Sequence, residues 1–346
     1  MTAMESNNLL EVHNLKKYFP IEKGLLRRVV GQVRAVDDVS LSIAAGQTLG
    51  LVGESGCGKT TLGRCVIRAI EPTEGQVLLR IDDRQADITG LDAKDLRATR
   101  RHMQMVFQDP YASLDPRKTI LDIVGEPLRV NKLARGEELE QRVRQLVDLV
   151  GLDVKYLKRY PHAFSGGQRQ RIGIARALSL HPSLIVCDEP VSALDVSVQA
   201  QILNLLQDLQ AEFSLTYLFI AHDLSVIQHI SDQVAVMYVG KIVEQAQTEE
   251  LFLNPKHPYT ESLLSAIPQP DPDALLDEIT LEGEVPSPAN PPPGCYFHPR
   301  CQYAQQLCQE EIPPLLEVSP DHFAACHFAQ ELTLHGVGDP EEGSRL

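Results

Sequence analysis

The chain has 346 residues, of which 43% are hydrophobic and 23% charged, a composition typical of a soluble globular protein rather than a disordered or fibrous one. This length is ample for a large α/β core with a second, appended part. The net charge of −15, from 32 basic and 47 acidic residues, argues against a surface that neutralises the phosphates of DNA or RNA, so no nucleic acid partner is expected.

The apolar stretches of the sequence are too short to cross a bilayer. Residues 215–221 are an example, and they have strand length where a spanning helix needs ~20 residues. The polar N-terminus, residues 1–8, does not resemble a secretory signal, which favours a cytoplasmic location. Any membrane role is therefore expected to come through a partner.

The chain opens with two stretches that alternate apolar and polar residues, Leu9 to Phe19 and Ala35 to Ile43. Such alternation is typical of half-buried strands, and a basic, glycine-containing insertion separates the two. We expect them to form an antiparallel β layer.

A phosphate-binding motif follows the apolar run from Thr48 to Val52, which is predicted to be a buried strand. The pattern G-x-x-x-x-G-K-[ST] is matched by Gly53, Glu54, Ser55, Gly56, Cys57, Gly58, Lys59 and Thr60. Glycines let backbone N–H groups wrap a phosphate, Lys59 places a positive charge on the β/γ oxygens, and Thr60 offers a hydroxyl to Mg²⁺. A helix predicted from Thr61 to Ala69 would aim its N-terminus at the anion. The motif predicts binding of a nucleoside triphosphate, against the alternative of a plain glycine-rich turn.

The middle of the chain is predicted to be mainly helical. A strand from Gln76 to Ile81 and a charged surface helix from Asp92 to Arg101 come first. From Pro110 to about Ala177 the pattern is mostly helical, as in Glu137 to Val150, whose apolar residues share one face. We expect a helical insert within an α/β domain.

Strand periodicity then returns. The strands Leu184 to Cys187 and Thr216 to Ile220 enclose a helix from Ser197 to Phe213, which predicts a β-α-β crossover between parallel strands. Val234 to Glu244 is predicted to be a hairpin that turns at Gly240.

Two carboxylates, Asp188 and Glu189, end the first of these strands. At the C-terminal edge of a strand in a phosphate-binding protein, one carboxylate can hold the Mg²⁺ shell while the other polarises a water towards the γ-phosphate. Asp188 is the expected metal-side acid and Glu189 the candidate general base. The alternative, a solvated acidic pair, suits an isolated Asp-Glu better than one that follows a buried run.

Six motifs in order give the chain a specific resemblance to the ATP-binding cassette (ABC) ATPase family. They are the loop Gly53 to Thr60, Gln108, the signature Ser165 to Gln168, the pair Asp188-Glu189, the segment Ser192 to Asp195, and His222. The resemblance covers about residues 9–253. It implies an α/β fold of the P-loop NTPase type, with a RecA-like core, an antiparallel β layer and an α-helical subdomain, working as a head-to-tail dimer that hydrolyses ATP.

The resemblance also implies a role for each matching residue. Gln108 resembles the Q-loop glutamine that senses Mg²⁺ and the attacking water, and His222 resembles the switch histidine that contacts the γ-phosphate. The signature Ser165, Gly166, Gly167 and Gln168 would reach ATP held by the partner's P-loop, although Phe164 stands where the family usually has leucine. A helix is expected to start just after the signature, near Gln170.

The remaining assignments complete the expected site. Asp195 matches the D-loop aspartate, and Thr61 is expected to join the P-loop residues at the nucleotide. Thr60, Gln108 and Asp188 are the expected Mg²⁺ residues. Phe19 resembles the aromatic that stacks on adenine, while its neighbour Tyr18 is an alternative and either ring could instead pack in the sheet.

After Leu253 the composition changes to a proline-rich one. A short helix from Tyr259 to Ala266 and an extended linker are expected, because this density of proline disfavours helix interiors and central strands. The tail from Gly336 onward is expected to be mobile. We therefore predict two domains: residues 1–253, with the helical subdomain at about 110–177, and a C-terminal extension over 254–346.

Motifs over nearly the whole chain narrow the resemblance to the ATPase subunits of dipeptide and oligopeptide importers. They include Asn254-Pro255-Lys256-His257-Pro258-Tyr259-Thr260 and the late segment His298-Pro299-Arg300-Cys301. This likeness implies a heterodimer with a paralogous ATPase, two membrane permease subunits that dock around Gln108 to Leu128, and an extracytoplasmic peptide-binding protein. The chain would then lie peripherally at the cytoplasmic face of the inner membrane.

Four cysteines crowd the C-terminal region, namely Cys295, Cys301, Cys308 and Cys326. Four thiolates are able to bind Zn²⁺ or a [4Fe–4S] cluster, and the tight C-x₂-C pairs typical of zinc ribbons are missing. Because members of the resembling importer group are associated with a C-terminal [4Fe–4S] cluster, iron–sulfur is favoured over zinc. His298, His322 and His327 keep a mixed Cys/His zinc site open, and an unligated group of cysteines is a third alternative.

Rival functions remain open from sequence. The same ATPase could serve another cargo, such as a nickel complex or haem. A soluble ABC ATPase that acts on nucleic acid or ribosomes usually carries two cassettes or a long coiled-coil insertion, and neither is present here. A non-hydrolysing module that senses redox state is opposed by the retained Glu189, His222 and signature.

Overall fold

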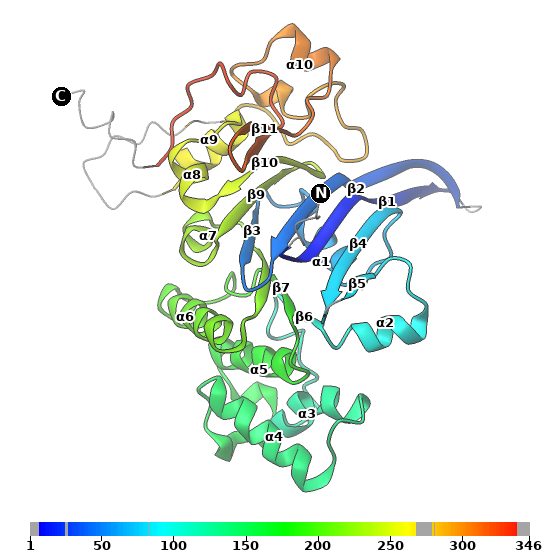
Figure 1. Ribbon diagram of the computed structural model, residues 1–346, viewed down its shortest axis with the longest axis vertical. Coiled ribbons are helices and arrows are strands. Elements are labelled where there is room, and N and C mark those ends of the chain that lie inside the picture. Colours follow the sequence, from blue (N-terminus) through cyan, green and yellow to red (C-terminus); the bar gives the residue numbers. More distant parts are fainter. Residues whose placement is uncertain (1–6, 25–26, 83, 268–278, 280, 338–346) are drawn as a thin grey trace, which may run out of the picture. The chain divides into compact units, whose positions relative to one another are not determined.

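The computed structural model describes residues 7–24, 27–82, 84–267, 279 and 281–337 (Figure 1). The chain divides into two compact units, each assembled from several stretches of sequence. The first contains Met1–Leu10, Ile43–Gln47 and Leu79–Ile220, and the second contains Glu11–Ser42, Thr48–Leu78 and Ala221–Leu346. The domain boundary expected near residue 253 stays a prediction.

The first unit contains a parallel three-stranded arrangement in the order β8-β7-β6. Its strands are β6 (Met103–Val106), β7 (Leu184–Asp188) and β8 (Thr216–Ile220), and α6 (Val196–Phe213) connects the last two. Every residue of β7 and β8 is buried, which explains why both read as continuous apolar runs. The predicted β-α-β crossover is confirmed.

Helices make up most of the rest of the first unit. They are α2 (Ala93–Thr99), α3 (Ile120–Val130), α4 (Gly136–Leu149) and α5 (Gly166–Leu178), and a short strand β5 (Arg84–Asp87) precedes them. In Figure 1, α3, α4 and α5 pack against one another. The apolar stripe of α4 is buried at Leu139, Val143 and Val147, so the predicted helical character of this stretch is confirmed.

The second unit holds five strands in the order β11-β12-β10-β9-β3. Their bounds are β3 (Thr48–Val52), β9 (Gln233–Tyr238), β10 (Lys241–Gln247), β11 (Leu316–Ser319) and β12 (His322–Ala324). β3 and β9 are parallel, whereas β10 pairs antiparallel with both β9 and β12. The predicted hairpin is therefore confirmed, but the two C-terminal strands were not foreseen.

The remaining elements lie wholly or mostly in the second unit. The strands β2 (Arg28–Ala44), β1 (Asn8–Lys23) and β4 (Glu74–Ile81) are neighbours in that order. The helices are α1 (Lys59–Val66), α7 (Leu224–Ile230), α8 (Thr248–Leu253), α9 (Pro258–Ser265) and α10 (Gln306–Glu310). Within the described parts of the chain, the structure contains no helix with the length and hydropathy of a membrane span.

Three predicted boundaries were wrong. The helix after the glycine-rich loop runs from Lys59 to Val66 rather than from Thr61 to Ala69, because Gly58 is its left-handed N-cap and Arg68 (φ 51°) leaves helical geometry. The signature helix begins at Gly166 rather than near Gln170. Much of the basic insertion is strand, since β1 continues to Lys23 and β2 starts at Arg28. Most of the tail that was expected to be mobile lies outside the described residues. Part of the expected extended linker also lies outside them.

A buried carboxylate fixes the C-terminal region to β10. Glu244 is fully buried and accepts hydrogen bonds from the backbone N–H groups of Lys256 (2.6 Å) and His257 (2.9 Å). Its third contact is with Nε2 of the buried His322 on β12, at 2.7 Å. Because a buried charge is stable only when it is well paired, Glu244 holds the segment before α9 and the strand β12 in place.

Candidate functional site

The phosphate-binding motif forms a tight loop between β3 and α1. Gly53, Gly56 and Gly58 all have positive φ, at 147°, 81° and 113°. A Cβ at Gly53 would lie 2.1 Å from the carbonyl oxygen of Met237, and one at Gly58 would lie 2.0 Å from that of Ala35. The loop therefore needs glycine for its backbone geometry and for the close approach of neighbouring chain segments.

We expect Gly58→Ala to unfold more easily than Gly56→Ala. Both substitutions impose a positive φ on alanine, at a cost of about 1–3 kcal/mol. Only Gly58→Ala adds a backbone clash, because a Cβ at Gly56 meets nothing within 4 Å. Urea denaturation without nucleotide compares the two, and equal unfolding free energies would show that the loop can relax around Ala35.

Lys59 lies inside this loop and is 5% exposed. Its Nζ donates to the carbonyl oxygens of Gly53 (2.6 Å) and Glu54 (3.0 Å). Thr60 and Thr61 follow on the first turn of α1 and are partly exposed, and Cys57 is buried, which raises the pKa of its thiol. The loop thus presents one cation and a helix N-terminus at the same place, as an anion site requires.

Glu54 of the loop is held by two residues that belong to the importer motifs but were not expected at the nucleotide site. Arg300 donates from both terminal nitrogens to the Glu54 carboxylate, at 2.7 and 3.0 Å. The hydroxyl of Tyr259 accepts the Glu54 backbone N–H at 2.8 Å. Since both residues lie more than 200 positions later in the chain, no local pattern could reveal these contacts.

The acidic pair lies at the end of β7 in the first unit. Asp188 is 1% exposed, and Glu189 follows in a left-handed conformation with φ 46°. The Nε2 atom of Gln108 donates to Oε2 of Glu189 at 2.8 Å. The structure therefore brings together two site residues that lie 81 positions apart, and it points the Glu189 side chain at the glutamine after β6.

The signature residues begin α5. Ser165 is the N-cap: its hydroxyl accepts from the N–H of Gln168, and the Gln168 side chain accepts from the N–H of Ser165 at 3.1 Å. A Cβ at Gly166 would lie 3.2 Å from Leu194, and one at Gly167 would lie 2.4 Å from Val198. Thus the signature packs against the segment that contains Asp195, which is exposed beside the 81% exposed Val196.

We expect opposite stability effects from two alanine substitutions in α5. Gly167→Ala should destabilise the chain by about 1–3 kcal/mol through overpacking against Val198. Gly173→Ala should stabilise it by about 0.5–1 kcal/mol, because this helical position has no neighbour within 4 Å of the new Cβ and alanine favours helix. Thermal unfolding of both variants checks the prediction, and a stabilised Gly167→Ala would contradict it.

His222 and Phe19 lie in the second unit. His222 is exposed two residues after β8, and Phe19 on β1 is 37% exposed with the Lys17 ammonium 4.9 Å from its ring centre. The neighbouring Tyr18 instead donates its hydroxyl to Asp37. The structure therefore distinguishes the two aromatic residues, because Tyr18 is engaged within the fold while the ring of Phe19 keeps an exposed face.

All four C-terminal cysteines line one small apolar cavity. The other lining residues include Phe297, Phe328 and Leu332. Burial raises the pKa of Cys301 to about 12 and that of Cys326 to about 11, and the neighbouring thiols add to both shifts. Among the described residues, no three His, Cys, Asp or Glu side chains are arranged to hold a single metal ion.

The histidines near the cysteines have other partners. His322 contacts Glu244, the His298 ring contacts the carbonyl oxygen of Cys295 at 2.9 Å, and the His327 ring contacts that of Glu311 at 3.0 Å. His298 and His327 also line the cavity, but the ring of each contacts a backbone carbonyl. Four thiols around an apolar space suit a sulfur-ligated group better than a mixed Cys/His zinc site.

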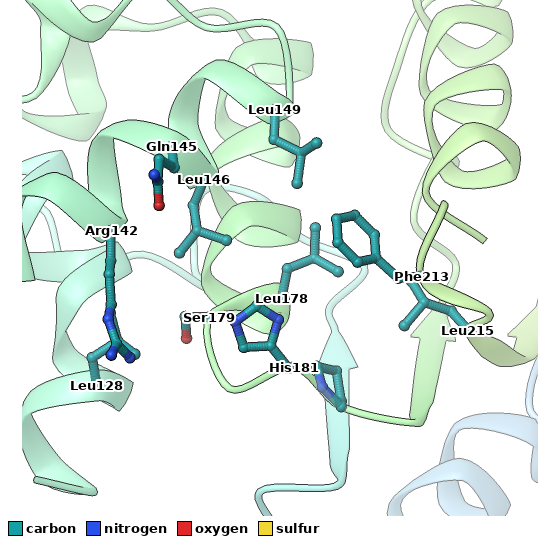
Figure 2. Close-up of a pocket in the computed structure, with 11 residues that line it drawn as sticks. Leu128, Arg142, Gln145, Leu146, Leu149, Leu178, Ser179, His181, Phe213 and Leu215 are labelled. Carbon is teal, nitrogen blue, oxygen red and sulfur yellow. The ribbon is translucent and has the colours of Figure 1, made fainter. Parts of the chain in front are cut away.

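A second cavity, of about 410 Å³, lies in the first unit (Figure 2). Leucines from α3, α4 and α5 form much of its wall, and Arg142 and His181 contribute polar groups. None of the predicted site residues lines it. It lacks the glycine-rich backbone and the lysine that a triphosphate needs, so it is not the nucleotide site.

Comparison with known proteins gives consistent matches. Residues 36–192 match the family described as ABC transporter, and residues 243–308 match the one described as oligopeptide/dipeptide transporter, C-terminal region. The oligopeptide transport ATP-binding protein AppF of Bacillus subtilis (strain 168) is 54% identical over 331 residues, 95% of this chain and 99% of that protein. The dipeptide transport ATP-binding protein DppF of Haemophilus influenzae is 49% identical over 322 residues, 93% of this chain and 97% of that protein.

Solved structures support the same fold. The ATP-binding cassette MJ0796, in a dimeric post-hydrolysis state bound to ADP and Pi, is 29% identical with a TM-score of 0.59, and the match covers 69% of this chain and 98% of that one. The protein cbiO1 of Clostridium perfringens, part of the ABC transporter complex cbiONQ, is 25% identical with a TM-score of 0.60, and the match covers 71% and 91%. The expected fold class, an ABC-type P-loop NTPase, is confirmed.

Proposed function

Because the chain belongs to the ABC transporter family of ATP-binding proteins, in the group with the oligopeptide/dipeptide transporter C-terminal region, we propose that it powers the uptake of dipeptides or oligopeptides across the cytoplasmic membrane. Its activity is ATP hydrolysis. The observation that carries this function is the contact between Gln108 and Glu189, since it places a candidate base beside a residue able to position water and Mg²⁺.

The roles of the site residues follow from their chemistry. The loop Gly53 to Thr61 binds the phosphates through its backbone N–H groups and Lys59, and Phe19 stacks on the adenine. Thr60, Gln108 and Asp188 would hold Mg²⁺, which would supply positive charge to the phosphates. Glu189 takes a proton from the attacking water, and His222 contacts the γ-phosphate.

A second ATPase subunit completes each nucleotide site. The exposed Ser165 and the rest of the signature, with Asp195 and Val196 nearby, form the face that meets a paralogous subunit in a head-to-tail dimer. ATP held by one subunit's loop is then covered by the other's signature. Closure of the dimer assembles the catalytic groups, and hydrolysis releases them. Each cycle of ATP binding and hydrolysis therefore moves the two subunits relative to one another.

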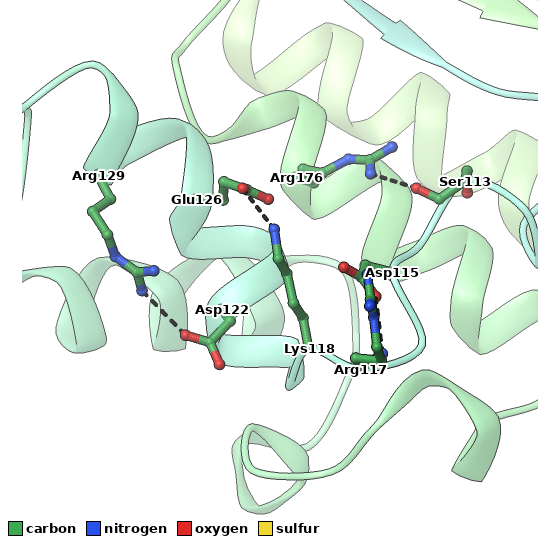
Figure 3. A network of polar contacts seen from close by, with 8 residues as sticks. All are labelled: Ser113, Asp115, Arg117, Lys118, Asp122, Glu126, Arg129 and Arg176. Atoms are coloured by element: carbon green, nitrogen blue, oxygen red, sulfur yellow. Dashed lines mark hydrogen bonds and ion pairs between the residues drawn. The ribbon is translucent and has the colours of Figure 1, made fainter.

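The surface from Gln108 to Leu128 is the proposed docking site for two membrane permease subunits. Figure 3 shows its polar network, in which Lys118 contacts Glu126 (2.7 Å) and Arg129 contacts Asp122 (3.2 Å). Arg176 on α5 donates to the carbonyl oxygen of Ser113 at 2.7 Å and so ties this surface to the signature helix. Tyr111 is 61% exposed there and offers an apolar contact to a partner.

The permeases would hold the chain at the cytoplasmic face of the inner membrane as a peripheral subunit. An extracytoplasmic binding protein would deliver the peptide. The test is reconstitution of the chain with its paralogue and permeases in vesicles that enclose MgATP. Peptide-loaded binding protein should raise phosphate release and peptide accumulation together, whereas phosphate release without any peptide response would refute the cargo assignment.

For the four-cysteine site we propose a [4Fe–4S] cluster, held by Cys295, Cys301, Cys308 and Cys326, with Zn²⁺ as the alternative. The shared apolar cavity and the contacts that the rings of His298, His322 and His327 make with other groups support the cluster. Such a group serves a structural or sensing role. Anaerobic purification should give a brown protein with bound iron and acid-labile sulfide, and a colourless protein that contains zinc would reject the cluster.

A further inference from the structure

The short segment from Cys295 to Cys301 joins the four-cysteine cavity to the nucleotide-binding elements. Both of its end residues line that cavity. Three side chains between them contact the nucleotide-binding elements. Tyr296 contacts β2, Phe297 packs against the tyrosines of β9 and α9, and Arg300 contacts the phosphate-binding loop. A shift of the cysteines would therefore move groups that touch the nucleotide site.

Arg300 makes a bidentate contact with the phosphate-binding loop. Its side chain is 6% exposed, and its two terminal nitrogens donate to the two carboxylate oxygens of Glu54 at 2.7 and 3.0 Å. The same guanidinium lies 3.4 Å from the Tyr238 hydroxyl, and its Nε is buried without a hydrogen-bond partner. A planar, bidentate pair of this kind fixes orientation as well as distance, so Arg300 sets the position of the first variable residue of the loop.

A second contact fixes the backbone of the same loop residue. The Tyr259 hydroxyl accepts the Glu54 N–H, and the Tyr259 ring packs 5.4 Å from that of Phe297 and 4.6 Å from that of Tyr238. Both the side chain and the backbone of Glu54 are thus held from the C-terminal region. This packing passes a displacement of Phe297 on to the loop.

A third contact reaches the strands on the adenine side. The Tyr296 hydroxyl donates to Asp37 of β2 at 3.0 Å, and Tyr18, next to Phe19 on β1, donates to the other oxygen of the same carboxylate. Lys241 lies 3.3 Å from Asp37. Burial alone would raise the pKa of Asp37, but the hydrogen bonds from Tyr18 and Tyr296 and the charge of Lys241 lower it overall.

We propose that Arg300 and Tyr296 are positioning residues through which the filling of the four-cysteine site sets the affinity of the chain for nucleotide. The proposal rests on the proposed function, since it needs the loop at Gly53 to Thr60 to bind ATP. A filled site holds the segment Cys295 to Cys301 in one arrangement and keeps Glu54 and Asp37 in place. By linkage, bound nucleotide then stabilises the filled cysteine site by the same factor.

The first test needs no metal. The dissociation constant of a fluorescent ATP analogue with Mg²⁺ is measured for wild type, Arg300→Gln, Glu54→Gln and the double variant. Arg300→Gln should weaken binding about 5-fold or more, and the double variant should be no weaker than Arg300→Gln alone, because the two residues act as one unit. Arg144→Gln, which breaks an exposed pair with Glu140 on α4, is the matched control and should bind as wild type does.

The second test compares the cysteine site in two states. Protein loaded anaerobically with ferrous iron and sulfide should bind the analogue about 5-fold or more tightly than the same protein after chelation. In Arg300→Gln this difference should disappear, and in Tyr296→Phe, which removes only one hydroxyl, it should shrink.

Two results would overturn the inference. One is equal nucleotide affinity of loaded and chelated wild type. The other is a difference that persists undiminished in Arg300→Gln. A wild type that binds no nucleotide in either state would instead refute the proposed function, so the two failures are distinguishable.

Discussion

Glu189→Gln should retain nucleotide binding and lose nearly all ATP turnover. The substitution keeps the shape of the side chain, and a glutamine oxygen can still accept the hydrogen bond that Gln108 Nε2 now donates to Glu189 at 2.8 Å. What disappears is the basic carboxylate, and loss of a general base lowers the rate by about 10²–10⁴-fold. Phosphate release by the reconstituted complex, measured beside the dissociation constant for ATP, separates these two effects.

Glu212→Gln on α6 provides the matched control, because Glu212 is an exposed acid that is assigned no role in the site. This variant should turn over ATP as wild type does. If Glu189→Gln hydrolysed ATP at the normal rate, the base assignment would be refuted. If it lost binding as well, Glu189 would instead be a ligand of the nucleotide or of Mg²⁺.

Lys59→Ala should weaken nucleotide binding, the step that precedes hydrolysis. The Lys59 ammonium is buried inside the glycine-rich loop, where its charge is poorly screened by water. A hydrogen bond to a charged group contributes about 1.5–3 kcal/mol, so the expected loss in affinity is about 10–100-fold. Titration calorimetry with ATP and Mg²⁺ measures it directly.

The control for this variant is Lys94→Ala on the exposed face of α2, which removes the same charge far from the loop in sequence. It should leave the dissociation constant unchanged. Unaltered affinity in Lys59→Ala would show that backbone N–H groups alone hold the phosphates. If the variant bound ATP normally but did not hydrolyse it, Lys59 would instead be assigned a role in the hydrolysis step.

Local sequence patterns were sufficient to find the motifs of the expected nucleotide site. The loop Gly53 to Thr60, the pair Asp188-Glu189 and the signature Ser165 to Gln168 could each be found in sequence, because tight turns, buried strands and helix starts depend on neighbouring residues. The errors concerned the ends of elements, which local patterns do not fix. In α1, for example, the helix ends three residues before the expected position, because Arg68 is left-handed.

Only the tertiary structure decided how the C-terminal region meets the rest of its unit. The strands β11 and β12 join the sheet beside β10, Glu244 holds His322, and Arg300 holds Glu54, and each of these partnerships joins residues more than 70 positions apart. The sequence predicted a phosphate-binding loop and a group of four cysteines as two separate features. Their connection depends on which distant side chains are buried together. A buried charged side chain such as Arg300 or Glu244 is stabilised by the partner that the completed fold brings to it, whatever that partner's place in the chain.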